Sequence, residues 1–385
     1  MLSKKAFCLL MTVSTFLGLM ACHAQRPAEP AAQEQQDSSA SLGISMQLKR
    51  IAEFNEPWAL AVLPDGRLLI TERSGQLILF NPIDQTKTLI RNIPKVAYGG
   101  QGGLGDIVLH PDFAQNHQIY LSYAEAGQGG YGAVVIRANL NLDQTQPQLD
   151  NLKTIWEQVP KVRGQGHYAH RMLFDGAGKL WISSGERQKF DPAQDLTSNL
   201  GKMIRLNDDG SVALDNPFQT QGDIAKQIWS LGHRNPLGMA LDAKKQLWMV
   251  EMGPKGGDEF NLIQKAKNYG YPIVSNGDHY SGLNIPDHVT RPEFEAPKLD
   301  WTPVISPSSL IFYTGQMFPK WQDKAIIGGL SSEALIIVDT TAQPVKEIQR
   351  IDMKERIRGL QQAKDGSIWV IEDGKNADLI QLLSH

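Results

Sequence analysis

Short apolar segments separated by polar turns recur along most of the chain, and this pattern predicts β-strands. The clearest example is a hairpin in which residues 239–241 and 246–250 form the strands and residues 242–245 form the turn. Further copies of this unit cover residues 58–80, 105–123, 170–184, 308–327 and 357–372, of which 308–327 is the least regular. Six strand-rich repeats at a spacing of roughly 45–70 residues, with little helical periodicity, predict an all-β fold: a six-bladed β-propeller over residues 46–385. A pair of β-sandwiches is the alternative fold.

A propeller brings distant parts of the chain together at one end of its axis. Loops just before the first strand of each repeat, or just after the second, converge there because the innermost strands all surround the axis. Polar clusters occupy these loops at residues 100–103, 164–167, 233–236, 253–254 and 356–358. We therefore expect these clusters to form one site.

Composition narrows the class of protein only moderately. Of the 385 residues, 41% are hydrophobic and 21% are charged, as in folded soluble proteins. The formal net charge of −3 disfavours a non-specific nucleic-acid binder, which would be strongly basic.

The N-terminus has the pattern of a targeting segment. Lys4 and Lys5 precede an apolar run at residues 7–20, which is too short to span a bilayer comfortably. The run ends in a sequence that resembles a bacterial lipobox, with Cys22 as the acylated residue. We expect a signal peptide at residues 1–21, a flexible tether at 22–45, and a periplasmic protein anchored by lipid to the outer membrane. Cleavage after Ala24, giving a secreted soluble protein, is the alternative.

Cysteine usage excludes several kinds of chemistry from the folded body. Cys8 and Cys22 are the two cysteines of the chain, and both precede the repeats. The propeller therefore contains no disulfide, no reactive thiol and no cysteine-ligated metal.

Several motifs taken together resemble one enzyme family. They are Gly102-Gly103-Leu104-Gly105 with His110-Pro111-Asp112-Phe113, Leu231-Gly232-His233-Arg234-Asn235-Pro236, Gly253-Pro254 through Asp258-Glu259-Phe260-Asn261, and Asn268-Tyr269-Gly270-Tyr271-Pro272. From about Phe54 to Leu382 the chain resembles the soluble quinoprotein glucose dehydrogenases and aldose sugar dehydrogenases. The resemblance implies a six-bladed propeller that uses pyrroloquinoline quinone (PQQ) and calcium.

PQQ is a planar quinone with three carboxylates, so arginines and amides suit it as partners. The resemblance implies that the residues lining its site are Gln101, Arg234, Asn235, Tyr280, Arg356 and Arg358. Alternation along a strand places the side chains of Arg356 and Arg358 on one face, where they could share an anion. The alternatives are an inter-blade salt bridge for Arg234 and a solvated edge for Arg356 and Arg358.

Calcium prefers oxygen ligands, including backbone carbonyls. The resemblance assigns the carbonyls of Gly253 and Pro254 to the calcium that polarises the quinone. It maps a second calcium site onto Glu259 and the carbonyl of Tyr269. As an isolated residue, Glu259 would more often cap backbone amides.

His167 is the candidate general base. An unperturbed histidine titrates near pH ~6.5, so a neutral imidazole is available to accept the proton of an anomeric hydroxyl while hydride passes from C1 to the quinone. The implied substrate is an aldose sugar, the product a lactone, and the electron acceptor a soluble carrier or the respiratory chain. The alternative for His167 is a structural histidine, and His170 is the second local candidate.

Three residues depart from the family pattern. Ser331 stands where the family usually has a lysine that contacts the quinone, Met252 stands where it has Gln or His, and Gly166 stands where glucose dehydrogenases often have an Asp beside the base. These departures keep open a non-catalytic propeller that has lost PQQ. A calcium-dependent lactonase, in which His167 activates water, is a further alternative, although the ring of acidic and amide ligands that it needs is missing.

Overall fold

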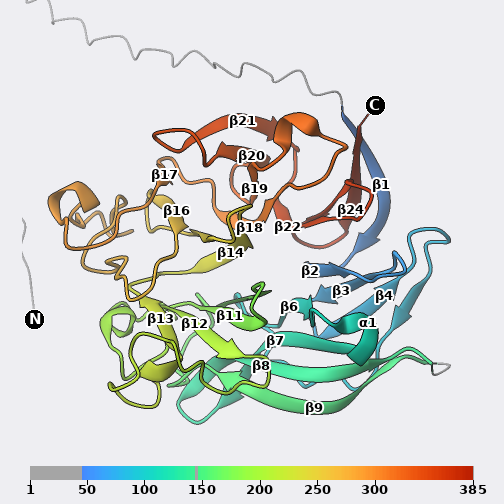
Figure 1. Ribbon diagram of the computed structural model, residues 1–385, viewed down its shortest axis with the longest axis horizontal. Helices are drawn as coiled ribbons and strands as arrows, with labels where there is room; N and C mark the ends of the chain where they lie inside the picture. The colour runs from blue at the N-terminus through green and yellow to red at the C-terminus, as the bar shows by residue number, and fades with distance from the viewer. Residues whose placement is uncertain (1–45, 144–145, 385) are drawn as a thin grey trace, which may run out of the picture. The chain divides into compact units, whose positions relative to one another are not determined.

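The computed structural model describes residues 46–143 and 146–384. The signal peptide and tether expected from the sequence lie outside these ranges. The described chain forms six four-stranded antiparallel sheets, arranged in a ring as the blades of a propeller (Figure 1). The predicted all-β, six-bladed fold is therefore confirmed, and the sandwich alternative is excluded.

Each blade follows the chain from the axis outward. Blade 1 contains β2 (Pro57–Val62), β3 (Leu68–Glu72), β4 (Gln76–Phe80) and β5 (Lys87–Leu89). Blade 2 contains β6 (Leu104–Leu109), β7 (Gln118–Gly127), β8 (Gly130–Asn141) and β9 (Gln148–Glu157). Blade 3 contains β10 (Ala169–Phe174), β11 (Lys179–Ser184), β12 (Lys202–Asn207) and β13 (Ile228–Leu231).

The second half of the chain repeats this order. Blade 4 contains β14 (Pro236–Leu241), β15 (Leu247–Glu251), β16 (Asp258–Leu262) and β17 (Leu299–Trp301). Blade 5 contains β18 (Pro307–Phe312), β19 (Ala325–Gly329), β20 (Ala334–Asp339) and β21 (Lys346–Asp352). The repeat that looked least regular in the sequence is thus a complete blade.

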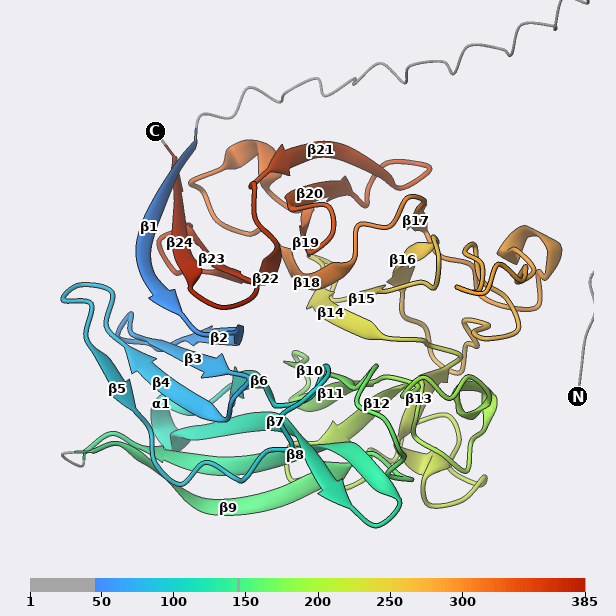
Figure 2. The same cartoon turned by 180° about the vertical axis from the view of Figure 1, so that it is seen from behind.

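Blade 6 is closed by the two ends of the described chain. It contains β22 (Ile357–Gln362), β23 (Ile368–Glu372) and β24 (Ala377–Ser384), and β1 (Met46–Phe54) adds the outermost strand. β1 and β24 are antiparallel, with Met46 paired to Ser384. Figure 2 shows β1 alongside β24, so hydrogen bonds between the first and last strands hold the ring shut.

Helical structure is minor in the part of the chain described. It comprises α1 (Phe113–Asn116) and short 3-10 turns at Asp191–Gln194, Ala225–Gln227, His288–Thr290 and Pro319–Trp321. No helix within residues 46–143 and 146–384 is long and apolar enough to cross a membrane.

The hairpin turns carry a repeated side-chain device. In blade 4 the Asp242 carboxylate accepts the backbone N–H groups of Lys244 and Gln246 and, through its other oxygen, the indole N–H of Trp248 at 3.0 Å. In blade 3 Asp175 accepts the N–H of Lys179 and, at 2.9 Å, the indole N–H of Trp181. An Asp at the start of a turn and a Trp on the returning strand therefore fix the register of both hairpins.

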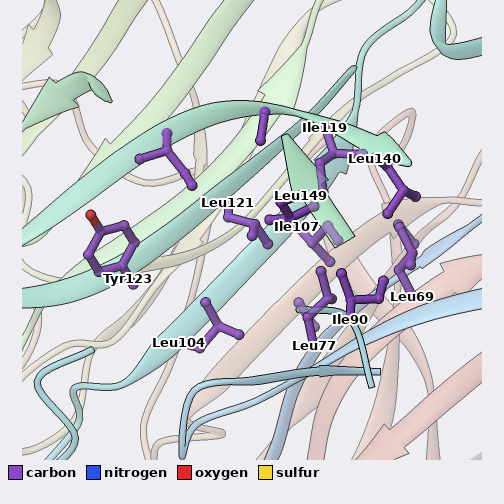
Figure 3. Packing of buried hydrophobic residues seen from close by; sticks show 14 of the residues in the cluster. Leu69, Leu77, Ile90, Leu104, Ile107, Ile119, Leu121, Tyr123, Leu140 and Leu149 are labelled. Carbon is purple, nitrogen blue, oxygen red and sulfur yellow. The ribbon is translucent and has the colours of Figure 1, made fainter. Parts of the chain in front are cut away.

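Apolar side chains fill the space between neighbouring blades. Figure 3 shows the packing between blades 1 and 2, where Leu69, Leu77 and Ile90 meet Ile107, Ile119 and other buried residues. Alternation on each strand directs one set of side chains toward each neighbouring blade, so both faces of a blade are covered. This packing holds the loops at the end of the axis in place.

One arginine ties the blades together on the axis. The first strands of the blades, β2, β6, β10, β14, β18 and β22, contact one another in a closed ring. Arg171 on β10 donates to the carbonyls of Leu237, Ser308 and Arg358 and lies 3.2 Å from the Asp106 carboxylate. Its guanidinium also stacks over Trp58 at 3.8 Å. Arg171, on the first strand of blade 3, thus contacts the first strands of all five remaining blades.

Candidate active site

Two neighbouring cavities are formed by the loops at one end of the axis. The larger, about 440 Å³, is lined by residues that precede a first strand, such as Gln101, Asn235 and Arg356, and by residues that follow a second strand, such as Met252 and Asp373. The smaller, about 260 Å³, contains His167, Arg234 and Pro254. The loops predicted to converge therefore do so, although they supply two cavities and not one.

Arginines and carboxylates face each other in the larger cavity. Arg73, Arg356 and Arg358 line it together with Glu56 and Asp373. Asp373 accepts from Arg356 at 2.9 Å and from Arg358 at 2.8 Å, so it is the anion that these two arginines share in the structure. Burial raises and the arginines lower the pKa of Asp373, and the net shift is downward.

Several buried polar atoms around the cavities lack a protein partner. They include Nε of Arg234 and Oδ1 of Asn235, together with Oε1 of Gln165 and the hydroxyl of Tyr168. Because buried polar groups are nearly always hydrogen-bonded, atoms left without partners mark a place for a polar ligand. A donor from Arg234 beside three lining arginines suits an anion with several carboxylates, so the residues present fit PQQ.

His167 forms a buried pair with Glu186. Its Nδ1 lies 2.5 Å from Oε1 of Glu186, and the Glu186 side chain is fully buried. Burial lowers the pKa of His167, with Arg234 adding to the effect and Glu186 opposing it. For Glu186, burial acts to raise the pKa, but His167, the N–H of Phe190 and the charge of Arg234 together outweigh it, and the pKa is lowered. A carboxylate on Nδ1 leaves Nε2 free of the proton and able to accept one.

Glu186 also resolves one departure from the family pattern. Position 166 is Gly166, and a Cβ there would lie 2.5 Å from the side chain of Gln188. The carboxylate beside His167 comes instead from the loop that follows β11. Gly185 permits this arrangement, because a Cβ at that residue would lie 2.0 Å from the carbonyl oxygen of His167.

The loop that carries His167 is fixed from two sides. The His167 N–H donates to Oε1 of Gln101 at 2.7 Å, which links the larger cavity to the smaller one. On the other side, Arg187 donates to the carbonyls of Gly164 and Gly166, at 2.6 and 2.8 Å, and stacks on Tyr168. The imidazole is therefore held in place before any ligand binds.

His170 and His233 have structural surroundings. His170 is buried, stacks on Trp58 with ring centroids 5.0 Å apart, and bonds Ser122. Burial and the neighbouring arginines lower its pKa to about 3. His233 bonds Glu251 at 3.0 Å and Ser230 at 2.9 Å, next to Arg234.

The expected ligands of the cofactor's calcium lie at the boundary of the two cavities. Arg234 donates to the Gly253 carbonyl at 2.6 Å, and Pro254 lines the smaller cavity. Asp258 fixes this loop by accepting the N–H of Gly253, and it also accepts those of Ile305 and Ser306. Burial raises the pKa of Asp258 to about 6.

The expected second calcium site contains closely spaced buried acids. Burial and the nearby Glu251 hold the pKa of Glu259 well above its usual range. Oδ1 of Asn261, whose amide nitrogen binds Glu259, has no protein partner. An unpartnered oxygen beside two acids fits a hard cation. The Tyr269 carbonyl is bonded to Nε2 of His288 at 3.1 Å. The described residues contain no group of three or more His, Cys, Asp or Glu side chains placed to hold a metal.

The remaining expected residues lie near the cavities with different neighbours. Tyr280 lines the smaller cavity, not the larger, and its ring lies 5.9 Å from the Arg234 guanidinium. Ser331 bonds Ser306 and the Val304 carbonyl. Met252 lines the larger cavity, and its carbonyl accepts from Arg234.

Comparison with known proteins gives the same picture over almost the whole propeller. The profile of the glucose/sorbosone dehydrogenase family matches residues 54–381. The chain belongs to the glucose/sorbosone dehydrogenase family.

Several relatives of the chain are aldose sugar dehydrogenases. The chain is 38% identical over 338 residues to the aldose sugar dehydrogenase YliI of Escherichia coli K12, covering 86% of this chain and 90% of that protein. The crystal structure of the soluble E. coli aldose sugar dehydrogenase in its apo form superposes with a TM-score of 0.83 at 37% identity, covering 89% of this chain and 100% of that one. The PQQ-bound aldose sugar dehydrogenase of Streptomyces coelicolor superposes with a TM-score of 0.73 at 26% identity, covering 89% and 99%.

Three charged residues of the site were not predicted from the sequence. Glu186, Arg73 and Asp373 each follow the second strand of their blades, β11, β3 and β23. Loops that follow the second strand of a blade converge at one end of the axis, and all three residues lie in such loops. Their positions relative to the predicted strands were therefore a sufficient signal, although no motif contains them.

Proposed function

We propose that this family member is a PQQ- and calcium-dependent dehydrogenase that oxidises aldose sugars at C1 to lactones. The observation that carries the proposal is the position of His167. The His167–Glu186 pair opens into the smaller cavity, and the next residues, Tyr168 and the start of β10 at Ala169 and His170, line the arginine-rich cavity. A base between a site for an anionic cofactor and a pocket for a second molecule suits oxidation of a bound alcohol.

When bound, PQQ would supply the hydride acceptor, and calcium would polarise its carbonyl. Arg234, Arg356 and Arg358 would hold its carboxylates, with Gln101 and Asn235 as amide partners. Tyr280 would close the site from the side of the smaller cavity. Gly253 and Pro254 would provide carbonyls for the cofactor's calcium, and Glu259 and Tyr269 would belong to a second calcium site.

The chain's own part in the reaction is proton transfer and positioning. Nε2 of His167 would accept the proton of the anomeric hydroxyl as the C1 hydrogen leaves. Glu186 would keep the accepting nitrogen directed at the sugar and stabilise the imidazolium that forms. We also propose that the enzyme works outside the cytoplasm on a lipid tether at Cys22, which Cys22→Ala would release from membranes.

The test is dye-linked oxidation of a panel of aldoses, with and without added PQQ and calcium. We expect activity that requires both, and we expect His167→Ala to lose it while still binding PQQ. PQQ binding can be followed independently, because Trp58 lines the larger cavity and its fluorescence should be quenched. A protein that neither binds PQQ nor oxidises any aldose would contradict the proposal and favour the non-catalytic alternative. Calcium-dependent lactone hydrolysis would favour the hydrolase.

A further inference from the structure

We propose that Phe190 is the surface on which the sugar ring is placed, and that it is the main determinant of aldose affinity in the smaller cavity. This inference rests on the proposed function and adds a residue to it. Among the residues that line this cavity, Phe190 is the one whose aromatic ring carries no polar atom.

The ring of Phe190 is exposed where most aromatic rings of this chain are buried. Its exposed fraction is 44%, and it lines the same cavity as His167 and Glu186. The ring of His279 stands edge-on to it at 5.8 Å, and that of Tyr271 lies at 6.3 Å. An open aromatic face flanked by two further rings suits the C–H face of a pyranose, while the polar side chains of the lining suit its hydroxyls.

The backbone holds Phe190 in this position against its own preference. Its φ is 62° and its ψ is −86°, a conformation that is strained for a residue with a side chain. The N–H of Phe190 donates to Oε2 of Glu186 at 2.8 Å, and its carbonyl accepts from Ala193 at 3.0 Å. The buried Lys202 ammonium then binds the carbonyls of Pro192 and Ala193. Strain that is maintained from both sides next to a reactive pair indicates a functional constraint.

Glu186 connects this ring to the base. One carboxylate oxygen bonds His167 and the other accepts the N–H groups of Lys189 and Phe190. The carboxylate that orients the imidazole therefore also fixes the ring that would receive the sugar. A sugar stacked on Phe190 would therefore be positioned relative to Nε2 of His167 by one side chain, that of Glu186.

The decisive experiment compares Phe190→Leu and Phe190→Tyr in the PQQ- and calcium-loaded enzyme, with Leu214→Ala as an exposed apolar control outside the lining of both cavities. Phe190→Leu should raise the KM for glucose about tenfold, with kcat changed by less than about threefold, because the lost stacking acts on binding. Phe190→Tyr and Leu214→Ala should behave like the wild type. Since the Phe190 N–H is retained, the acid limb of the pH profile should not move in Phe190→Leu.

Three results would overturn the inference. An unchanged aldose KM in Phe190→Leu would show that the ring does not bind the sugar. A change confined to the KM of the dye would make Phe190 a contact for the electron acceptor. A shifted acid limb would show that the ring only supports the Glu186 loop.

A direct binding measurement separates this inference from the proposed oxidation. Saturation-transfer NMR with glucose should give a signal for wild-type protein that Phe190→Leu weakens and Phe190→Tyr keeps. If the wild type oxidises no aldose but shows binding that depends on Phe190, the dehydrogenase proposal fails, whereas Phe190 remains the sugar-binding surface. If glucose does not bind the wild type, the proposed role of Phe190 is wrong as well.

Discussion

At the scale of single residues, the pair of His167 and Glu186 predicts a specific pH behaviour. The bond from Glu186 opposes the lowering of the His167 pKa by burial, so Glu186→Gln should lower that pKa further. The acid limb of kcat/KM should then move to lower pH, because the imidazole stays neutral in more acidic solution. The rate should fall about 10²-fold, since the imidazolium loses its partner.

The matched control is Glu293→Gln, which removes a surface carboxylate paired with Arg291. It should leave both the rate and the pH profile unchanged. An acid limb that moves to higher pH in Glu186→Gln would show that Glu186 does not act on the base in this way.

Glu259 predicts a second effect at this scale, on stability. Without a cation the pKa of Glu259 lies well above its usual range, so its carboxyl is protonated and resembles the amide of Gln. In the presence of a chelator, Glu259→Gln should therefore change the free energy of unfolding very little. In wild-type protein, calcium at 100 times its Kd should add about 2.7 kcal/mol to the free energy of unfolding, and Glu259→Gln should lose this gain. Calcium affinity should rise with pH, because binding releases the Glu259 proton.

Thermal unfolding in calcium and in chelator measures the stabilisation by calcium of the wild type and of Glu259→Gln. Glu295→Gln, which alters a carboxylate paired with Lys267 and Lys298, is the control and should keep the calcium response. Equal stabilisation of Glu259→Gln and wild type by calcium would place the ion elsewhere.

At the scale of elements, the sequence predicted the inner strands well and the outer ones poorly. Residues 239–241 and 246–250 became β14 and β15 because an Asp-led turn and alternating apolar residues specify a hairpin locally. Strands such as β5 and β17 have three residues and little apolar pattern, so their pairing depends on the blade that they join. The pairing of β1 with β24 joins positions too far apart for any local pattern to show.

β1 provides a prediction at this scale. A chain that begins at Met46 should unfold cooperatively like the full-length protein, whereas one that begins at Asn55 should lose cooperative unfolding and aggregate. The reason is that removing β1 uncovers the edge of β24 and removes the buried side chains of Ile51 and Phe54, which exposes apolar neighbours such as Phe80. Circular dichroism melts and size-exclusion chromatography measure the outcome. A well-folded monomer starting at Asn55 would show that the ring does not need this closure.

At the scale of the whole molecule, Arg171 is the residue that connects all six blades. Arg171→Met should lower the free energy of unfolding by about 3–5 kcal/mol, because it leaves the Asp106 carboxylate and three carbonyls buried without their partner. Arg205→Met is the control: Arg205 is also a largely buried arginine, but its partner Asp215 is exposed, so the loss should be smaller. Denaturant unfolding curves compare the two variants. Equal losses in the free energy of unfolding would show that the contacts of Arg171 at the axis contribute no more than those of another buried arginine.

The site was predictable only as far as its motifs extended. Gln101, Arg234, Asn235, Arg356 and Arg358 lie in recognisable sequence around the cavities, and the convergence of their loops followed from the propeller itself. The carboxylates that balance these arginines lie outside those motifs, and only their position shortly after the second strand of a blade indicates that they belong to the site. Asp373 and Glu186 acquire their roles from residues in other positions of the ring.

The closure of blade 6 also sets the order in which this protein is completed during its synthesis. The residues of β1 leave the ribosome before any other part of the propeller, and those of β24 leave after all the rest. Blades 1 to 5 are each built from one continuous segment, so they can form while the chain is still growing. β1 has no partner strand until β24 has emerged. The ring that positions the site can therefore close only after β24 has been synthesised, with the earliest segment waiting for the latest.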